Sequence, residues 1–564
     1  MNRNNIYVGL GLCGLLLAGC KQPIDRSIFA YQAEPVKLQL EKRGDSYFAT
    51  GYSAFSAEDH FTWGASVTKA DNGKYYMIFS APEAYQYPFG NAWVMGSKLG
   101  LAVSDRPDGG FKKLGFFYNQ DGFVHDTSAW DAQTVSNPHV RKFGDTYYLY
   151  YAGSVDPGNL NVKSKTDTLD IRSRIQQSQQ IGVITFKSFE GLLQGDFEHY
   201  DKPLLAPRTR VKPTDVVNPS PEGTIPRPDN LITVNPSVVY RPSDKKYLLY
   251  FKGNIYDPHW RGIHGVALSD SPTGPFVPLD QSVFEIPTQD GEKLSAEDPY
   301  VWYNHRDRLF YAIFKDFTGK FTKSDPCLAL MYSEDGIHWQ LPEHSLFMKK
   351  ELVLSSGDTI KVDRLERPQL LLDENDDPLV LYAACSVAEL NKKTDGSSFN
   401  VQIRLKKQEG GFRVPCIMWG GMVKPGHITQ MGSSLDLLPT CCEMAGVNLP
   451  VGIQLDGVSL LNVLQDNLAD SKREEFFFYR GSLLYAVRKG KYKLHYMNKS
   501  AYGSDPVVVY DKPKLYDLGT DPEEKYDIAG QYPEVVKELD QMATRHKASF
   551  EVAESIFDLK NKNI

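Results

Sequence analysis

Acidic residues stand immediately before two strand-like segments of this chain, at Glu297-Asp298 and at Glu366-Arg367. A proline and an apolar run follow each pair, PYVWY from Pro299 and PQLLL from Pro368. Two carboxyls can divide the work of catalysis, because a protonated one donates a proton while an ionised one activates a nucleophile or stabilises positive charge. The pattern therefore predicts acid–base chemistry, provided that the fold brings these strand starts together.

The elements that must position these acids belong to an internal repeat. Five copies of a hairpin pattern begin at Ala65, Pro138, Pro236, Pro299 and Pro368, as in PHVRKFGDTYYLYYAG and PSVVYRPSDKKYLLYFKG. Each copy joins two strands rich in β-branched and aromatic residues through a polar turn. One such hairpin cannot bury its own apolar surface, so the five copies must share a core.

Outer segments such as HGVALSDSPTGPFVPL, from His264, alternate with the hairpins and add further strands to each unit. This alternation predicts a mainly β fold, a five-bladed β-propeller over residues 45–407, followed by a smaller C-terminal α/β domain over residues 408–564. A β-sandwich is the competing interpretation. The recurrence of the inner hairpin argues against it, because the strands of a sandwich have no reason to repeat.

A propeller gathers the starts of its innermost strands around one axis, so the residues before each hairpin are expected to converge. Among them, carboxylates, amides, basic groups and tryptophans are the types that could bind and cleave a sugar. The candidate catalytic residues are Asp298, Glu366, Asp131 and Glu297. The candidate substrate-binding residues are Trp63, Trp130, Asn137, Asn235, Arg364, Arg367 and Lys315.

Residues 45–407 resemble the five-bladed propeller glycosidases, the family 43 glycoside hydrolases and their relatives. SAEDPYVWY from Ser295, RLERPQLLLD from Arg364 and the SDSPTGPF turn carry the resemblance. It implies two aspartates and a glutamate at inner-strand starts, acting as base, pKa modulator and acid, and an inverting mechanism. Asp298 and Glu366 match such positions.

The first repeat departs from that pattern, because Trp63-Gly64 stands where the resemblance implies an aspartate base. The second and third repeats carry Asn137 and Asn235 instead. We therefore expect the base to be Asp131, which lies close upstream of its strand. The competing interpretations are structural: an Asp before Pro often caps a turn, and Glu366 could form an ion pair with its arginine neighbours. Glu297 and Asp298 are also neighbours in a strand, so only one of them is expected to face the axis.

The bulk composition excludes some functions. A net charge of -7 provides no basic stripe for nucleic acid. The first twenty residues combine Arg3, a short apolar run and Leu17-Ala18-Gly19-Cys20. This ending resembles a bacterial lipobox, which implies a signal peptide over residues 1–20, lipidation of Cys20, a linker over 21–44 and attachment to the outer membrane. An ordinary secretory signal is the alternative.

No metal or cofactor is expected from the residues. The cysteines after Cys20 are odd in number and show no zinc spacing. An axial calcium ion cannot be derived from the sequence.

The segment after Glu409 resembles the C-terminal part of type I sulfatases, through EGGFRVPCIMWGGMVKPG, SSLDLLPTCCEMAG and KLYDLGTDPEEKYDIA. Such enzymes need a Cys-x-Pro/Ala-x-Arg segment, whose cysteine becomes formylglycine, and an early Asp-Asp pair for calcium. This sequence has no cysteine in that context. We therefore expect no sulfatase activity.

Together these features predict an exported glycoside hydrolase that cleaves a glycan at its non-reducing end. Two alternatives stay open. A phosphate-dependent phosphorylase would need a basic cluster, which Arg364, Arg367 and Lys315 could supply. A non-catalytic glycan-binding lipoprotein is the second, and the missing aspartate of the first repeat is its best support.

Overall fold

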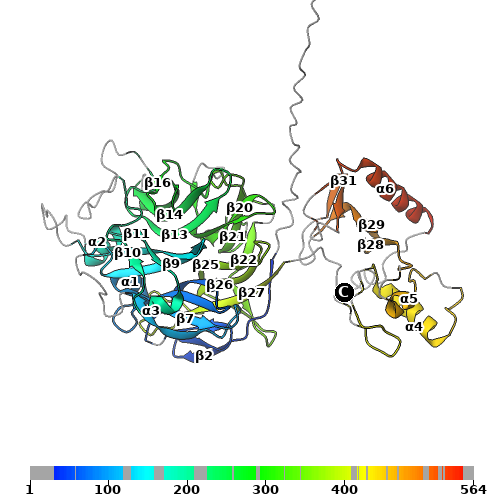
Figure 1. Cartoon of the computed structure of the whole chain (residues 1–564), viewed down its shortest axis with the longest axis horizontal. Coiled ribbons are helices and arrows are strands. Elements are labelled where there is room, and N and C mark those ends of the chain that lie inside the picture. Colours follow the sequence, from blue (N-terminus) through cyan, green and yellow to red (C-terminus); the bar gives the residue numbers. More distant parts are fainter. Residues whose placement is uncertain are drawn as a thin grey trace, which may run out of the picture. The chain divides into compact units, whose positions relative to one another are not determined.

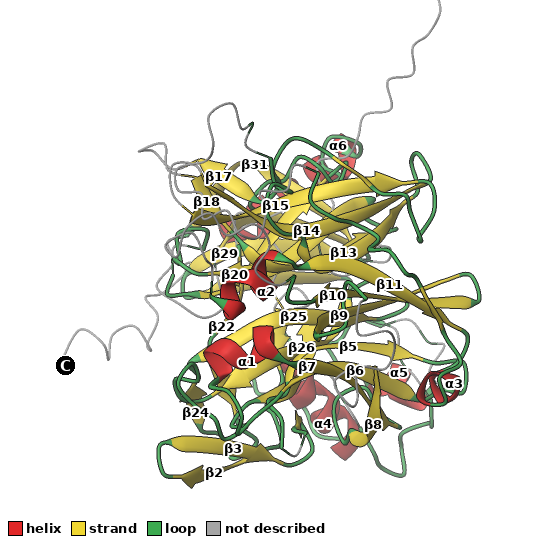
Figure 2. Ribbon diagram, turned by 90° about the vertical axis from the view of Figure 1, so that its left-hand side faces the viewer, coloured by secondary structure: helices red, strands yellow, loops and turns green. Residues whose placement is uncertain are grey.

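The structure is a computed structural model. It describes residues 31–550 apart from gaps at 58, 119–128, 158–169, 209–224, 226, 257–259, 288–292, 323, 343–344, 408–415, 417, 427, 429, 453–454, 467–468, 470, 500–506, 519–523 and 525–526. Cys20 lies outside the described residues. The chain divides into two compact units, Phe29–Lys407 and the residues that follow. The predicted predominance of β-structure is confirmed, since the described elements are mostly strands with a few short helices (Figure 2).

The larger sheets of the first unit are one of eight strands, one of five and two of four, built mostly from successive stretches of the chain (Figure 1). The eight-stranded sheet consists of two antiparallel parts, sheet A and sheet B. Sheet A has β5 (Trp63–Lys69), β6 (Tyr75–Pro82), β7 (Ser97–Ser104) and β8 (Lys112–Tyr118). Sheet B has β9 (Thr134–Phe143), β10 (Thr146–Ser154), β11 (Gln180–Phe186) and β12 (Glu198–His199). Sheet C has β13 (Val234–Arg241), β14 (Lys246–Tyr256), β15 (Trp260–Ser269) and β16 (Val277–Pro278).

Sheet D has β19 (Glu297–Asn304), β20 (Leu309–Asp316), β21 (Cys327–Ser333) and β22 (Leu346–Lys349). Sheet E has β25 (Arg364–Leu372), β26 (Pro378–Ser386) and β27 (Phe399–Lys407), and both β1 (Tyr31–Ala33) and β4 (Ala54–Phe55) pair with β27. The last sheet is thus completed by strands from the start of the described chain. A single parallel bridge, Ser97 to Thr134, links sheets A and B.

Short elements connect the sheets. They are the helices α1 (Phe89–Met95), α2 (Ile171–Gln177) and α3 (Phe189–Leu193), and the hairpins β2 (Gln39–Arg43) with β3 (Ser46–Thr50), β17 (Glu285–Pro287) with β18 (Lys293–Ser295), and β23 (Glu351–Val353) with β24 (Thr359–Lys361).

The first strands of the five sheets pack against one another in sequence. β5 contacts β9, β9 contacts β13, β13 contacts β19, β19 contacts β25, and β25 contacts β5 again. Apolar clusters fill the spaces between neighbouring sheets. One cluster, for example, joins Val239 and Tyr250 of sheet C to Val301 and Ala312 of sheet D. The repeat thus yields sheets that bury their faces against each other, with their first strands innermost.

The second unit is a small α/β structure. It contains the 3-10 turn Ser434–Asp436, α4 (Leu437–Ala445), α5 (Leu461–Gln465), the sheet β28 (Glu475–Arg480), β29 (Leu483–Lys489), β30 (Tyr492–Asn498) and β31 (Val508–Asp517), and α6 (Pro533–Ala548). Leu539, Met542 and Ala543 of α6 pack on the sheet. No described helix is long and apolar enough to cross a bilayer.

Candidate active site

The five inner strands share one backbone feature near their starts. Gly64, Asn137, Asn235, Asp298 and Arg367 occupy equivalent repeat positions and adopt φ angles of +32°, +56°, +56°, +55° and +53°. The pairing with the second strand of each sheet shifts at the same point, so each strand bulges there. Gly, Asn and Asp tolerate this left-handed region better than other residues. At the bulge, the side chain of each of these residues no longer follows the alternation of faces along its strand.

Hydrogen bonds join four of the five bulge residues, and Gly64 lies beside Arg367 and Asn137. Asn137 Nδ2 donates to Asn235 Oδ1 at 2.6 Å, and Asn235 Nδ2 donates to Asp298 Oδ1 at 2.6 Å. Arg367 Nη1 donates to the same oxygen at 3.1 Å. A Cβ atom on Gly64 would lie 3.3 Å from Arg367 Nε and 3.5 Å from Asn137 Oδ1. We call these five residues the axial ring.

The neighbours of Gly64 come from two other repeats. The guanidinium of Arg367 and the amide of Asn137 lie beside it, so a larger side chain there would require these neighbours to shift. The carboxylate of Asp298 is buried and accepts hydrogen bonds from Asn235 and Arg367. Both of these hydrogen bonds tie the Asp298 carboxylate to the axial ring.

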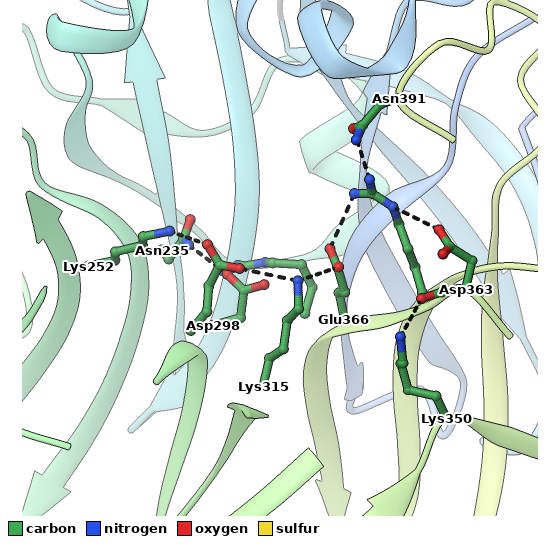
Figure 3. Close-up of polar contacts among 11 residues, drawn as sticks. Asn235, Lys252, Asp298, Lys315, Lys350, Asp363, Glu366 and Asn391 are labelled. Atoms are coloured by element: carbon green, nitrogen blue, oxygen red, sulfur yellow. Dashed lines mark hydrogen bonds and ion pairs between the residues drawn. The ribbon is translucent and has the colours of Figure 1, made fainter. Parts of the chain in front are cut away.

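The residues one position earlier, Glu297 and Glu366, lie outside the ring and share one lysine. Lys315 Nζ donates to Glu366 Oε1 at 2.5 Å and to Glu297 Oε2 at 3.4 Å (Figure 3). Lys252 forms an ion pair with Glu297 as well. These side chains keep between 12% and 21% of their surface exposed, whereas Asp298 keeps 6%. The two glutamates thus form a partly accessible acid pair.

The surroundings of the two glutamates shift their pKa values in opposite directions. Burial raises the pKa of Glu366, and Lys315 and Arg364 offset that rise only in part. Burial would raise the pKa of Glu297 too, but Lys252 and Lys315 outweigh it and lower the pKa to about 2. Burial works against the charge on Lys315, yet Glu366 and Glu297 outweigh it and raise the lysine pKa. One carboxyl is held ionised while its neighbour is biased toward the protonated form.

Arg364 and Trp63 lie beside Glu366. Arg364 Nη1 is 3.7 Å from Glu366 Oε2, and its Nη2 donates to Asn391 Oδ1 at 2.8 Å. The guanidinium lies over the rings of Trp63 and Phe89, at 5.9 Å and 5.3 Å from their centroids. Trp63 itself is buried against Phe89. Trp63 supports the arginine, and its burial leaves little ring surface for stacking on a sugar.

Asp131, the expected base, has its described contacts with a different set of residues from the glutamates. Its Oδ2 accepts hydrogen bonds from Tyr118 at 2.8 Å and Tyr151 at 2.6 Å, and lies 3.1 Å from His199 Nε2. Burial would raise the pKa of Asp131, but the hydrogen bonds from His199 and Tyr151 outweigh it and lower the pKa. The carboxylate is buried and held by Tyr118 of sheet A together with Tyr151 and His199 of sheet B.

Trp130 also lies within sheet B. Its ring stacks on Tyr151 with centroids 6.0 Å apart, and a Cβ on Gly182 would lie 2.7 Å from its Cζ2. The ring packs over Gly182 and Gly153 and stays half-buried, so its expected role as a sugar-stacking platform stays a prediction. The loop before a strand can turn away from the axis, which the repeat alone could not reveal.

Lys252 is a site residue that the sequence argument missed. It follows the aromatic run of the second strand of the third repeat, YLLYFKG, just as Lys315 follows that of the fourth, FYAIFKD. In register, Lys315 lies opposite Glu297 and Lys252 lies opposite Val234. The recurrence of a lysine after this aromatic run was a signal that could have identified Lys252 alongside Lys315.

The second unit contains a buried ion cluster of its own. Lys493 Nζ donates to Glu524 Oε1 at 2.6 Å, and His495 Nε2 lies 2.7 Å from Glu524 Oε2. No group of three metal-ligating side chains occurs among the described residues of the chain.

Comparison with known proteins relates the two parts of the chain to different proteins. Residues 471–564 match the family described as the C-terminal region of aryl-sulfatase. Human arylsulfatase A is 29% identical over 297 residues, covering 47% of this chain and 57% of that protein. The bovine arylsulfatase A is 37% identical over 167 residues, covering 26% and 32%. The chain thus spans from about a third to just over half of these relatives.

Among solved structures, the chain resembles a family 117 glycoside hydrolase produced by the marine bacterium Zobellia galactanivorans. The TM-score is 0.41 with 14% identity, covering 68% of this chain and 91% of that one. The catalytic domain of a Coprinopsis cinerea GH62 alpha-L-arabinofuranosidase gives a TM-score of 0.41 with 12% identity, covering 67% and 98%. The two resemblances inferred from the sequence motifs, to propeller glycosidases and to the C-terminal part of sulfatases, are confirmed as resemblances.

Proposed function

We propose that this chain is a glycoside hydrolase in which Glu366 is the proton donor and Glu297 the ionised carboxylate. The observation that carries the proposal is the shared Lys315, which contacts both carboxyls while their environments shift the two pKa values in opposite directions. A protonated carboxyl beside an ionised one is the arrangement that cleaves glycosidic bonds. The five sheets serve in this proposal as the blades of a five-bladed propeller, with the acid pair beside the axial ring.

The resemblance to family 43 enzymes implies inversion, but one oxygen of each carboxyl approaches the other closely. Glu297 Oε2 and Glu366 Oε1 contact the same Lys315 nitrogen, so these two oxygens lie at most about 6 Å apart, which favours the ~5–5.5 Å carboxyl separation of retaining enzymes over the ~6.5–9.5 Å of inverting ones. We therefore propose retention in place of inversion. Exo action stays part of the proposal, and it rests on the family resemblance alone.

The steps follow from the two roles. Glu297 attacks the anomeric carbon, the glycosidic C–O bond breaks, and the leaving oxygen takes the proton of Glu366. The ionised Glu366 then removes a proton from water, which attacks the anomeric carbon and releases Glu297. Lys315 moves no proton in this scheme. It holds the two carboxyls in place and stabilises whichever of them is negative.

The C-terminal unit and the leader complete the proposal. We propose that the sulfatase-like unit has no sulfatase activity, since the sequence lacks the nucleophilic cysteine segment; release of nitrophenol from 4-nitrophenyl sulfate by the purified chain would contradict this. We further propose export and lipidation at Cys20 for attachment to the outer membrane. Incorporation of labelled palmitate in a bacterial host, lost in Cys20→Ala, tests that anchor.

The experiment for the enzymatic proposal is a screen of the purified chain against aryl glycosides and against plant, algal and host oligosaccharides. Product anomers are followed by proton NMR from the first minutes. Hydrolysis with initial retention supports Glu297 as nucleophile, whereas initial inversion would return it to the role of a base. Absence of cleavage across the panel would favour the alternative of a glycan-binding protein.

A further inference from the structure

The acid pair lies among charged side chains in which cations slightly outnumber carboxyl groups. The charged residues in or bordering the network of Figure 3 comprise five cations, Lys252, Lys315, Lys350, Arg364 and Arg367, and four carboxyl groups, Glu297, Asp298, Asp363 and Glu366. When Glu366 carries the proton that its proposed role requires, the excess of positive charge grows. A site for a neutral sugar has no need of this excess, and it favours an anion.

Arg364 has donors to spare within this set. Among the described residues it makes one hydrogen bond of ordinary length, from Nη2 to Asn391. Its Nε lies 3.5 Å from Asp363 Oδ2 and its Nη1 lies 3.7 Å from Glu366 Oε2, distances at or beyond the limit of a hydrogen bond. A guanidinium has five N–H groups, so most of its donor capacity is open to a ligand.

Arg364 is also held in place before a ligand arrives. Its guanidinium lies over Trp63 and Phe89, and only 18% of the side chain is exposed. Stacking on aromatic faces leaves the edge of the planar group available, and that edge matches the two oxygens of a carboxylate, sulfate or phosphate. Little conformational freedom remains to be lost on binding.

We propose that Arg364, with Lys315, forms an oxyanion subsite that binds an acidic group next to the bond to be cleaved. The ligand is either a uronate or sulfate substituent of the glycan or an inorganic phosphate co-substrate. Because Arg364 neighbours Glu366, a bound substituent belongs to a sugar adjoining the scissile bond. The inference rests on the proposed function for its assignment of the anion to a glycosidic substrate, while the subsite itself is testable without turnover.

The two sources of the anion lead to different chemistry. An acidic substituent only orients the sugar, and water remains the acceptor. Inorganic phosphate would itself react in the place of water: after Glu297 has formed its bond to the anomeric carbon and the leaving oxygen has taken the proton of Glu366, a phosphate oxygen attacks the anomeric carbon, the bond to Glu297 breaks, and Glu366 regains a proton from the phosphate. The product is then a sugar phosphate, which is the phosphorylase reaction.

Binding of four probes to the full chain tests the proposal: galacturonate, galactose 6-sulfate, neutral galactose and inorganic phosphate, by ligand-detected NMR at constant ionic strength. We expect at least one oxyanion to bind more tightly than galactose, and Arg364→Gln to weaken it roughly tenfold or more, as for a lost charge-assisted hydrogen bond pair. Arg404→Gln is the matched control. Arg404 also has two long carboxylate contacts, at 3.8 Å and 3.7 Å, but on strand β27.

Each outcome bears on the proposal. Preferential binding of the acidic sugars places the anion on the glycan, and preferential binding of phosphate identifies a co-substrate. Equal affinity for galactose and all three oxyanions, or an Arg364→Gln protein that binds them as the Arg404→Gln control does, overturns the subsite. Arg364→Lys replaces Arg364→Gln in this test if the latter folds poorly. It keeps the positive charge but loses the planar guanidinium with its paired N–H donors, and it should bind the oxyanions with intermediate affinity. Glu366→Gln should abolish hydrolysis yet retain anion binding, which separates the failure of one proposal from that of the other.

Discussion

Lys315→Met removes the cation that the two glutamates share. In the wild type, the ammonium lies 2.5 Å from Glu366 Oε1 and 3.4 Å from Glu297 Oε2. The positive charge lowers the pKa of each carboxyl, so its removal raises both. Without the lysine the two carboxyls also repel each other directly and titrate as a coupled pair.

The size of the effect follows from the distances. Two unit charges about 4 Å apart interact by about 4 kcal/mol at an effective dielectric constant of about 20, and one pKa unit corresponds to about 1.4 kcal/mol. Two effects offset part of this rise. The cost of burying the ammonium disappears with the lysine, and the remaining cations, Lys252 and Arg364, still stabilise the ionised carboxylates. We therefore expect each pKa to rise by about 1–2 units.

The pH dependence of kcat/KM on a substrate from the glycan screen is the assay. Activity requires Glu297 ionised and Glu366 protonated, so the acid limb reports the pKa of Glu297 and the alkaline limb that of Glu366. Both limbs should move to higher pH in Lys315→Met. In the matched variant Lys252→Met, which removes a partner of Glu297, the acid limb should move and the alkaline limb should stay.

If folded Lys315→Met shifts neither limb by more than about 0.3 units, well below the 1–2 units expected for a contact at these distances, Lys315 does not set the pKa values of the two glutamates. A shift of the limbs to lower pH would contradict that role as well, because no loss of a neighbouring cation can lower these pKa values. Circular dichroism and urea unfolding of each variant establish that the protein is folded.

Three further outcomes are expected. Glu366→Gln should lower kcat by about 10²–10⁴-fold. Its control is Asp363→Asn, which changes an exposed carboxyl beside Arg364 and should lower kcat by less than about tenfold. Equal losses of kcat in the two variants would show that Glu366 has no special role. Asp131→Asn should lower the free energy of unfolding in urea by about 1–3 kcal/mol, because it weakens the buried hydrogen bonds from Tyr118 and Tyr151. Its kcat/KM should stay within about twofold of the wild type. A loss of activity without a loss of stability would indicate that Asp131 is a catalytic residue. Gly64→Ala should lower the free energy of unfolding by about 1 kcal/mol or more beyond the loss in Gly144→Ala. Both glycines have positive φ, but only Gly64 has neighbours within 4 Å of the added Cβ. Similar losses in the two variants, measured by urea unfolding, would argue against the packing of the axial ring.

The sequence indicates the sheets well because the hairpin pattern recurs and alternation along a strand sets which side chains face the core. The same recurrence places Asn137, Asn235 and Asp298 at equivalent points, and the structure joins them by hydrogen bonds. The roles within each pair could not be predicted, since a bulge interrupts the alternation and assigns Asp298 to the ring and Glu297 to the acid pair.

Other features depended on contacts between distant parts of the chain. Asp131 lies in a loop whose direction no repeat specifies, and only the fold shows that Tyr118, Tyr151 and His199 surround it. The glycine of the first repeat likewise looks like a missing catalytic residue until Arg367, from the fifth repeat, is seen beside it. A side chain from one sheet can occupy the position that another sheet leaves open.

Hydrolysis of a glycan by the purified full chain, compared with Glu366→Gln at equal concentration, tests the central claim most directly. The panel includes neutral, uronate-containing and sulfated oligosaccharides, and new reducing ends are quantified. Our account predicts that the wild type releases a sugar from at least one substrate and that Glu366→Gln lowers this rate by about 10²-fold or more. Cleavage that persists undiminished in folded Glu366→Gln would contradict the account.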